Sequence, residues 1–400
     1  MKAIFNPSQL KGNISAPPSK SMAHRYLICA ALSKGKSLIS GVDFSEDILA
    51  TIDCLKALGA EIEAAEDTVS VNPEGFMKNT SATLNCRESG STLRFFIPLC
   101  LCLGKEITLT GSSRLFERPL GVYEKLSEEN GFKFLKDENS VTLSGKLKSG
   151  QYEISGDTSS QFITGLIFAL SYLGEDSSIR IIPPFESRSY VNLTISALKL
   201  FGADIEFTDE YNIVIRKSDL HSFSGRVEGD YSNAAFLDAF NYIGSEVKIG
   251  NLNPESLQGD KVYKRYFDEI SKGTPTLDIR NCPDLGPVLI ALSYLKNGAV
   301  LTGTDRLKVK ESDRGMVMHE ELSKLGKGLS FGDNTITVPK GEKPTEKALL
   351  NGHNDHRIVM ALSLILSKYG GEIEGAEAVR KSYPGFFRDI EKLGAEVKTE

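Results

Sequence analysis

The sequence of 400 residues has no uninterrupted apolar run of the length, about 18 residues, that a membrane-spanning helix requires. The segment Met1–Pro7 contains no long apolar stretch of the kind found in secretory signals. These absences argue against a membrane-spanning or exported protein. We expect a cytoplasmic protein that has no membrane partner.

The cysteines show no metal-binding or redox pattern. The six of them form no Cys-x-x-Cys pair, and none stands with a histidine at the spacing of a zinc site. Four lie in apolar stretches, namely Cys29, Cys54, Cys100 and Cys102. We therefore expect reduced thiols in the protein core and no bound metal.

The sequence also lacks an excess of positive charge. Its formal net charge is −6 at pH 7, which argues against a general binder of nucleic acid or of membrane surfaces. Any anion-binding site must therefore be built from local groups of lysine and arginine. With 40% apolar and 25% charged residues, the chain is long enough for two globular domains of about 200 residues each.

What the sequence does contain is an internal repeat. The pattern Leu-x-x-x-Gly, or a close variant, recurs before alternating apolar residues, which predicts a helix that ends at a glycine and leads into strands. The glycines are Gly59, Gly131, Gly202, Gly273, Gly326 and Gly394. Their spacings are 72, 71, 71, 53 and 68 residues, so the unit after Gly273 has lost about 18 residues. The loss corresponds to one β-hairpin.

A second landmark recurs in phase with the glycines. It is a polar turn that leads into an apolar helix, marked by Lys20, Gly90, Ser160, Ser232, Asp284 and Asp355. Such turns supply helix caps, and each helix start presents free N–H groups and the positive end of its dipole. Six helix starts directed at one cleft would form a strong anion site, although a repeat could also arrange them along a solenoid.

The segment Arg306–Arg314 is rich in charge and leads into an apolar stretch. If it opens a helix, Lys310 and Arg314 lie on one face, where like charges repel. The arrangement suits a phosphorylated ligand attended by Glu311 as a proton-transfer group. The alternative is a solvated helix start held together by ion pairs.

Seven short motifs follow one another in a fixed order. They are Ser19–Ser21 with Arg25, Ser89–Thr92 with Arg94, Phe116–Leu120, Asp157–Phe162, Lys308–Arg314, Asn354–Arg357 and Lys381–Pro384. Each motif alone is weak evidence, but the ordered set covers nearly the whole chain. It resembles the enolpyruvyl transferase family, and within it the 5-enolpyruvylshikimate-3-phosphate synthases.

The resemblance implies an α/β fold of two similar domains, each built from three βαβαββ repeats in an inside-out α/β barrel. The repeat in the sequence agrees with this architecture, with the fifth repeat shortened by about 18 residues. The implied domains are residues 21–227, and residues 1–20 plus 228–400. The active site would lie in the cleft between the domains.

The resemblance also implies a reaction. The enolpyruvyl group of phosphoenolpyruvate would be transferred to the 5-hydroxyl of shikimate 3-phosphate, and phosphate would leave a tetrahedral intermediate. This is the step of the shikimate pathway that precedes chorismate and the aromatic amino acids. The enzyme would need no cofactor, metal or nucleic acid, would act as a monomer, and would be inhibited by glyphosate in competition with phosphoenolpyruvate.

The family's roles carry over to the positions that match its motifs. Shikimate 3-phosphate would contact Lys20, Ser21, Arg25, Ser159, Ser160, Gln161, Ser187, Asp284 and Lys310. Phosphoenolpyruvate would contact Lys20, Gly90, Arg118, Gln161, Arg314, Arg357 and Lys381. Asp284 would accept the hydroxyl proton, and Glu311 would relay a proton to C3. Lys20 and His356 are alternative donors of that proton.

Several positions depart from the family pattern or have simpler explanations. Glu88 and His24 stand where the family commonly has asparagine, and Arg306 stands where a phosphate-binding asparagine is expected. Asp284 could simply cap a helix, as could the three serines of the proposed phosphate site. Carboxylates among so many cations should stay ionised, which suits a base better than an acid.

Two other functions stay open at this point. The sister enzymes that transfer enolpyruvyl to UDP-N-acetylglucosamine typically have a cysteine where this chain has Ser113, and the absence of that thiol disfavours them. The other is a non-catalytic protein that binds phosphorylated metabolites in the same cleft. Binding without phosphate release would identify it.

Overall fold

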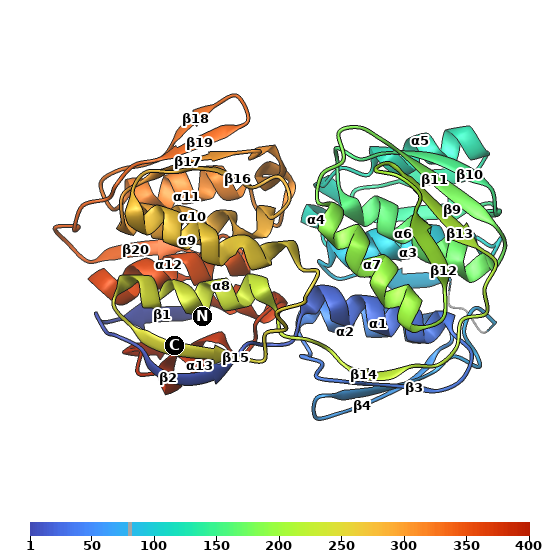
Figure 1. The fold of residues 1–400 in the computed structure, drawn as a ribbon, viewed down its shortest axis with the longest axis horizontal. Coiled ribbons are helices and arrows are strands. Elements are labelled where there is room, and N and C mark those ends of the chain that lie inside the picture. The colour runs from blue at the N-terminus through green and yellow to red at the C-terminus, as the bar shows by residue number, and fades with distance from the viewer. Residues whose placement is uncertain (79–81) are drawn as a thin grey trace. The chain divides into compact units, whose positions relative to one another are not determined.

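The computed structural model describes residues 1–78 and 82–400 (Figure 1). The chain divides into two compact units, which we call the first unit (residues 18–228) and the second unit (residues 1–17 and 229–400). Across these described ranges, no helix has both the length and the apolar character needed to cross a membrane.

The first unit contains three mixed sheets of four strands each. In every sheet a parallel pair is extended by an antiparallel hairpin, in the orders β14-β3-β5-β4, β6-β7-β9-β8 and β10-β11-β13-β12. The strands are β3 (Ser37–Ser40), β4 (Glu61–Ala65), β5 (Thr68–Asn72), β6 (Thr83–Asn85), β7 (Ile107–Thr110), β8 (Lys133–Lys136), β9 (Ser140–Ser144), β10 (Gln151–Ser155), β11 (Ser177–Ile182), β12 (Asp204–Phe207), β13 (Asn212–Arg216) and β14 (Ser224–Arg226).

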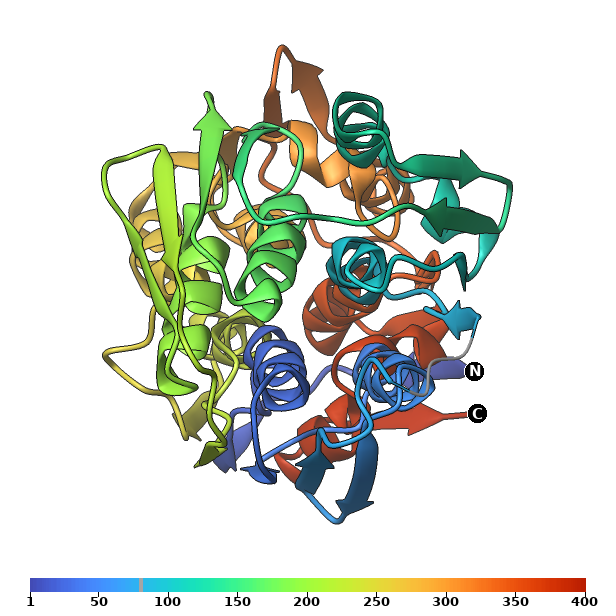
Figure 2. The ribbon, with the colours of Figure 1, turned by 90° about the vertical axis from the view of Figure 1, so that its right-hand side faces the viewer.

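The helices of the first unit are of two kinds. Three are apolar on nearly every side and therefore buried, and in Figure 2 they lie inside the strands of this unit; they are α1 (Lys20–Leu32), α3 (Gly90–Leu101) and α6 (Ser160–Leu173). The others have exposed polar faces; they are α2 (Glu46–Ala57), α4 (Ser113–Glu117), α5 (Gly121–Asn130) and α7 (Arg188–Leu200).

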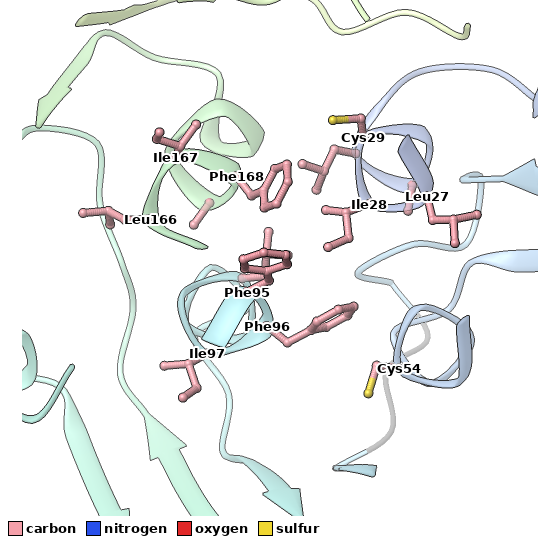
Figure 3. Packing of buried hydrophobic residues seen from close by; sticks show 14 of the residues in the cluster. Leu27, Ile28, Cys29, Cys54, Phe95, Phe96, Ile97, Leu166, Ile167 and Phe168 are labelled. Atoms are coloured by element: carbon pink, nitrogen blue, oxygen red, sulfur yellow. The ribbon is translucent and has the colours of Figure 1, made fainter. Parts of the chain in front are cut away.

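The inner helices share one core. Figure 3 shows Phe95 of α3 against Phe168 of α6, with ring centroids 5.5 Å apart, and Ile28 of α1 on the same apolar cluster. Repeats that meet around a common core exclude the solenoid alternative. The six cysteines are free and buried, which confirms the prediction of reduced core thiols.

The second unit repeats the plan with one short sheet. Its sheet orders are β20-β21-β1-β22, β16-β17-β19-β18 and β15-β2. The strands are β1 (Lys2–Phe5), β2 (Lys11–Ser15), β15 (Glu246–Gly250), β16 (Thr276–Asp278), β17 (Ala299–Thr302), β18 (Ser330–Gly332), β19 (Thr335–Val338), β20 (Ala348–Asn351), β21 (Gly371–Glu374) and β22 (Val397–Thr399).

The helices of the second unit follow the same division. The inner ones, which pack on one another, are α8 (Tyr231–Ala239), α10 (Gly286–Leu295) and α12 (His356–Tyr369). The others are α9 (Tyr263–Lys272), α11 (Arg314–Ser323) and α13 (Phe386–Lys392). Short 3-10 turns complete the unit, namely η1 (Asn241–Ile243), η2 (Gly259–Val262), η3 (Pro283–Leu285), η4 (Asp305–Val309) and η5 (Ala376–Lys381).

The loss of one hairpin is confirmed. The sheet of β2 and β15 has two strands where the other five have four. Counted as strand, helix, strand, helix and hairpin, the shortened repeat is the fourth and not the fifth, because the missing hairpin would follow α9. Asn241 occupies the open edge of β15: its side chain accepts from the Val247 N–H at 2.6 Å and donates to the Val247 C=O at 2.8 Å.

The predicted helix-ending glycines have the expected geometry with one exception. Gly131 ends α5 in the left-handed region, at φ 71°, where glycine has no Cβ penalty. Gly273 ends α9 at φ 178°, which is extended backbone that any residue adopts. The exception stands where the hairpin is missing, so the chain continues directly to β16.

Candidate functional site

The polar turns that mark the repeat are confirmed as helix starts. Side chains cap five of the six inner helices by accepting a backbone N–H; the caps are Ser19 (α1), Ser89 (α3), Ser159 (α6), Asp230 (α8) and Asp355 (α12). The sixth helix, α10, follows η3 and has no side-chain cap. Asp284, which lies in η3, is therefore not the helix cap that the simpler explanation required.

Asp284 instead lies among three cations of the second unit. Its carboxylate is 2.9 Å from Arg314 Nη1, 3.1 Å from Arg357 Nη2 and 3.2 Å from Lys310 Nζ. Burial alone would raise its pKa, but these three cations outweigh burial and hold the pKa well below its usual range. Asp284 is therefore ionised at neutral pH and can accept a proton.

Arg314 joins three carboxylates in the second unit. Besides Asp284, its guanidinium lies 2.6 Å from Glu311 Oε2 and 2.9 Å from Asp355 Oδ2. The Arg314 side chain is only 1% exposed and that of Asp355 is fully buried. A buried guanidinium that binds three carboxylates is held in one position, and its removal would leave the buried Asp355 carboxylate without this cation. We call Asp284, Lys310, Glu311, Arg314, Asp355 and Arg357 the Asp284 cluster.

The charged segment before α11 is not a single helix. It passes from η4 through Lys310 to Asp313, which caps α11 by accepting the Met316 N–H. Lys310 and Arg314 thus do not share a helical face, although both reach Asp284. Burial lowers the pKa of Lys310 to about 8, despite the opposing effect of Asp284.

The remaining predicted residues of the second unit, Lys381 and His356, lie next to Asn354 and Asp355, the second of which belongs to this cluster. Lys381 ends η5, and its Nζ donates to the Asn354 carbonyl at 2.7 Å. His356 is buried at the start of α12, with Nδ1 3.9 Å from Asp355 Oδ1. Lys381 and His356 thus both lie against the segment of Asn354 and Asp355, and the Asp355 carboxylate in turn binds Arg314.

Three of the four predicted contacts to phosphoenolpyruvate in the first unit, Lys20, Gly90 and Gln161, lie at the starts of α1, α3 and α6, and the fourth, Arg118, follows α4. Lys20 forms an ion pair with Asp47 of α2 at 2.6 Å. Gln161 accepts from Arg94 Nη1 at 2.8 Å and donates to Ser91 Oγ at 2.9 Å, which ties the start of α6 to α3. We call Lys20, Gly90, Arg94, Arg118 and Gln161 the Lys20 cluster.

Gly90 lies against the Arg118 guanidinium. A Cβ placed on Gly90 would be 2.5 Å from Arg118 Nη1 and 2.8 Å from its Cζ. Real Cβ atoms do not approach other heavy atoms so closely. The absence of a side chain at position 90 therefore leaves room for the Arg118 guanidinium in its present position.

Arg25 is held within the first unit by three hydrogen bonds. It donates to Thr194 Oγ1 at 2.9 Å, to the Tyr190 carbonyl at 2.8 Å and to the Ser21 carbonyl at 2.6 Å. Burial lowers its pKa to about 10, so it stays charged at neutral pH. The arginine thus fixes the relative positions of α1 and α7.

The serines of the predicted phosphate site differ in their roles. Ser159 caps α6, and Ser160 is the buried first residue of that helix. Ser187 is buried before α7 with φ 54°, in the left-handed region that few non-glycine residues adopt. Of the departures from the family pattern, His24 is buried and bonded to Thr51 at 2.7 Å, and burial holds its pKa well below 6.5.

Three carboxylates that belong to these clusters or interact with them were not among the predicted site residues. They are Asp47, Asp260 and Asp355. Asp355 lies inside the recognised motif Asn354–Arg357, and the other two open the second helix of their repeats, so a signal was present for each. Asp260 bonds Ser232 of α8, and burial, reinforced by the charge of Asp284, raises its pKa to about 6.

Comparison with solved structures defines the class of the fold. The chain is similar over its full length to the EPSP synthase of Acinetobacter baumannii, with a TM-score of 0.80 and 22% identity over 100% of both chains. The enolpyruvyl transferase NikO of Streptomyces tendae gives a TM-score of 0.75 with 14% identity, over 99% of this chain and 98% of that one. The fold is that of the enolpyruvyl transferases, as predicted.

Sequence comparison identifies the particular family. The chain is 39% identical to the 3-phosphoshikimate 1-carboxyvinyltransferase of Clostridium kluyveri, over an alignment of 415 positions that covers 98% of this chain and 97% of the relative. A protein of the same name from Clostridium perfringens is 38% identical over 100% of both chains. Residues 4–390 match the family model of EPSP synthase (3-phosphoshikimate 1-carboxyvinyltransferase). The chain belongs to the EPSP synthase family.

Proposed function

We propose that the protein transfers the enolpyruvyl group of phosphoenolpyruvate to the 5-hydroxyl of shikimate 3-phosphate and releases phosphate. Family membership indicates the reaction. The single structural observation that supports it best is the ionised Asp284 among Lys310, Arg314 and Arg357. This arrangement supports the proposal because Asp284, as proton acceptor, would lie beside cations suited to phosphate and carboxylate groups.

Asp284 is the proposed base for the 5-hydroxyl. An aspartate with a strongly lowered pKa is a weak base. Anionic substrates that contact Lys310 and Arg357 would, however, compensate part of the positive charge that stabilises the carboxylate. Substrate binding would thereby raise the pKa of Asp284 and make it a better acceptor when the hydroxyl is in place.

Delivery of a proton to C3 is assigned to Glu311. Its carboxylate lies 2.6 Å from Arg314, in the same cluster as the proposed base, and a relay must lie close to the reacting group. Lys20 and His356 stay alternative donors. Glu311→Gln and Lys20→Met distinguish Glu311 from Lys20, because only replacement of the true donor should slow the incorporation of a solvent proton at C3.

The proposed substrate contacts include residues of both clusters. For shikimate 3-phosphate we propose Lys20, Ser21, Arg25, Ser159, Ser160, Gln161, Ser187, Asp284 and Lys310. For phosphoenolpyruvate we propose Lys20, Gly90, Arg118, Gln161, Arg314, Arg357 and Lys381. Both units would thus contribute to one reaction. We also propose that the protein acts as a monomer in the cytoplasm.

The test is an acceptor comparison. The purified protein is mixed with phosphoenolpyruvate and either shikimate 3-phosphate or UDP-N-acetylglucosamine, without added metal, and inorganic phosphate is measured. Release with shikimate 3-phosphate alone is the expected result. Release with UDP-N-acetylglucosamine alone would assign the sister reaction, and binding of both substrates without release would identify a non-catalytic binding protein.

A further inference from the structure

A buried carboxylate outside the Asp284 cluster supports the same part of the second unit. Glu321 of α11 is 1% exposed. Its Oε2 accepts from the Asn351 N–H at 2.9 Å, and its Oε1 lies 2.8 Å from His353 Nε2. Lys324 Nζ lies 2.8 Å from both oxygens. The carboxylate therefore joins α11 to the turn that follows β20.

This turn has an unusual backbone. His353 and Asn354 are consecutive non-glycine residues in the left-handed region, with φ of 47° and 53°. Such conformations cost free energy and persist only where surrounding contacts enforce them. The enforcing contacts are the two bonds from Glu321, together with the Asn351 side chain, which accepts the His353 N–H at 2.7 Å.

The turn leads directly into proposed substrate-binding groups. The Asn354 carbonyl accepts from Lys381 at 2.7 Å. Asp355 then caps α12 at Arg357 N and binds Arg314 Nε, each at 2.9 Å. Movement of the turn would therefore displace Lys381, Arg314 and Arg357 together, and these are the three residues of this unit assigned to phosphoenolpyruvate.

Helix α11 holds the segment at two points. Arg314 and Glu321 are seven residues apart, which is about two helical turns and places both side chains on one face. Arg314 binds Asp355 at the end of the turn, and Glu321 binds Asn351 and His353 at its beginning. A single rigid helix thus fixes both ends of the strained turn.

Glu320, Glu321 and His353 also bring their ligand atoms within 4.8 Å of one another, a grouping that can hold a metal ion. Here the Lys324 ammonium already donates to both Glu321 oxygens, which are the atoms that would bind a metal ion. Glu320 is largely exposed, and its carboxylate is 4.0 Å from His353. The contacts describe a hydrogen-bonded support and not an ion site.

We propose that Glu321, acting through His353, is a positioning residue that holds Lys381, Arg314 and Arg357 in place for phosphoenolpyruvate. The inference rests on the proposed function. It goes beyond that function because Glu321 touches neither substrate, and it concerns the affinity for one of the two substrates only.

The test separates positioning from stability. In Glu321→Ala, the KM for phosphoenolpyruvate should rise on the order of tenfold while the KM for shikimate 3-phosphate changes less than about twofold. Glu321→Gln should restore much of the affinity, because its amide still accepts from Asn351 N–H and can donate to the other tautomer of His353. Glu320→Gln, which removes a neighbouring charge, is the matched control and should behave as wild type.

A second variant keeps the test decisive if Glu321→Ala does not fold. His353 is partly exposed, so His353→Ala should fold. It should raise the KM for phosphoenolpyruvate at least about threefold, because it removes one hydrogen bond from the support of the turn. A KM for phosphoenolpyruvate that is unchanged in the folded variants, or raised equally in Glu320→Gln, overturns the proposal.

Failure of the proposed function would be visible separately. If the wild-type protein releases no phosphate, hydrogen exchange decides the positioning claim. The amides of Asp355 and Arg357, which bond Gly352 O and Asp355 Oδ1, should exchange faster in His353→Ala than in Glu320→Gln. Equal exchange in the two variants would refute the role of the turn.

Discussion

Replacement of Gly90 by alanine is the substitution whose effect the structure defines most clearly. The new methyl carbon would lie 2.5 Å from Arg118 Nη1 and 2.8 Å from Cζ and Nη2. Ordinary contact requires about 3.5 Å, so the guanidinium must move away by roughly 1 Å. Gly90 is the first residue of α3, where alanine is at least as favourable as glycine, and we expect no loss of stability.

The displacement should appear in one kinetic constant. Misplacement of a binding group by about 1 Å costs up to about a hundredfold in efficiency, so we expect the KM for phosphoenolpyruvate to rise between about tenfold and a hundredfold. The KM for shikimate 3-phosphate should change little, because Arg118 is assigned only to phosphoenolpyruvate. Glyphosate, which we expect to compete with phosphoenolpyruvate at this position, should inhibit the variant less than the wild type.

The assay is phosphate release at varied phosphoenolpyruvate with saturating shikimate 3-phosphate. Gly121→Ala is the matched control, because Gly121 also begins a helix and a Cβ there would meet nothing closer than Glu124 Oε2 at 3.9 Å. An unchanged KM in Gly90→Ala, or an equal rise in Gly121→Ala, would refute the reasoning.

Three further predictions concern charge and the shortened sheet. Lys310, with a pKa of about 8, loses its charge as the pH rises, so the KM for shikimate 3-phosphate should increase between about pH 7 and pH 9, and Lys310→Arg should flatten that increase. Asp260 has its pKa raised from 3.8 to about 6, so the folded state loses stability as the pH rises from about 4 to about 6 and stays destabilised above that range. Chemical denaturation should show Asp260→Asn more stable by up to about 3 kcal/mol at pH 8, with little gain near pH 3. Asn241→Ala removes both bonds to the edge of β15 and should lower the free energy of unfolding by about 1 to 2 kcal/mol, with kcat unchanged.

The repeat shows what sequence can predict about this fold. Caps and helix-ending glycines are local signals, so the polar turns and the missing hairpin were predictable from spacing alone. The start of α11 was predictable in principle as well. Asp313 is a good cap, and its presence argues that the helix begins at Arg314 and excludes Lys310.

The pairing of charges within the site was beyond sequence reasoning. Arg314 and Asp355 are 41 residues apart and belong to different repeats, and nothing local indicates that they meet. The same holds for Glu321 and the turn at His353. Motifs indicate which residue types occur at a site, whereas the balance between buried charges depends on packing between elements that only the structure shows.

The measurement that tests the central claim most directly is shikimate 3-phosphate-dependent phosphate release by one variant from each unit. We choose Lys20→Met from the first unit and Asp284→Asn from the second, and confirm by circular dichroism that both fold. The account predicts that each alone lowers kcat/KM by at least about a hundredfold, because Asp284 is the proposed base and Lys20 is the proposed contact of both substrates. Wild-type turnover in either folded variant would contradict the claim that the two clusters serve one reaction.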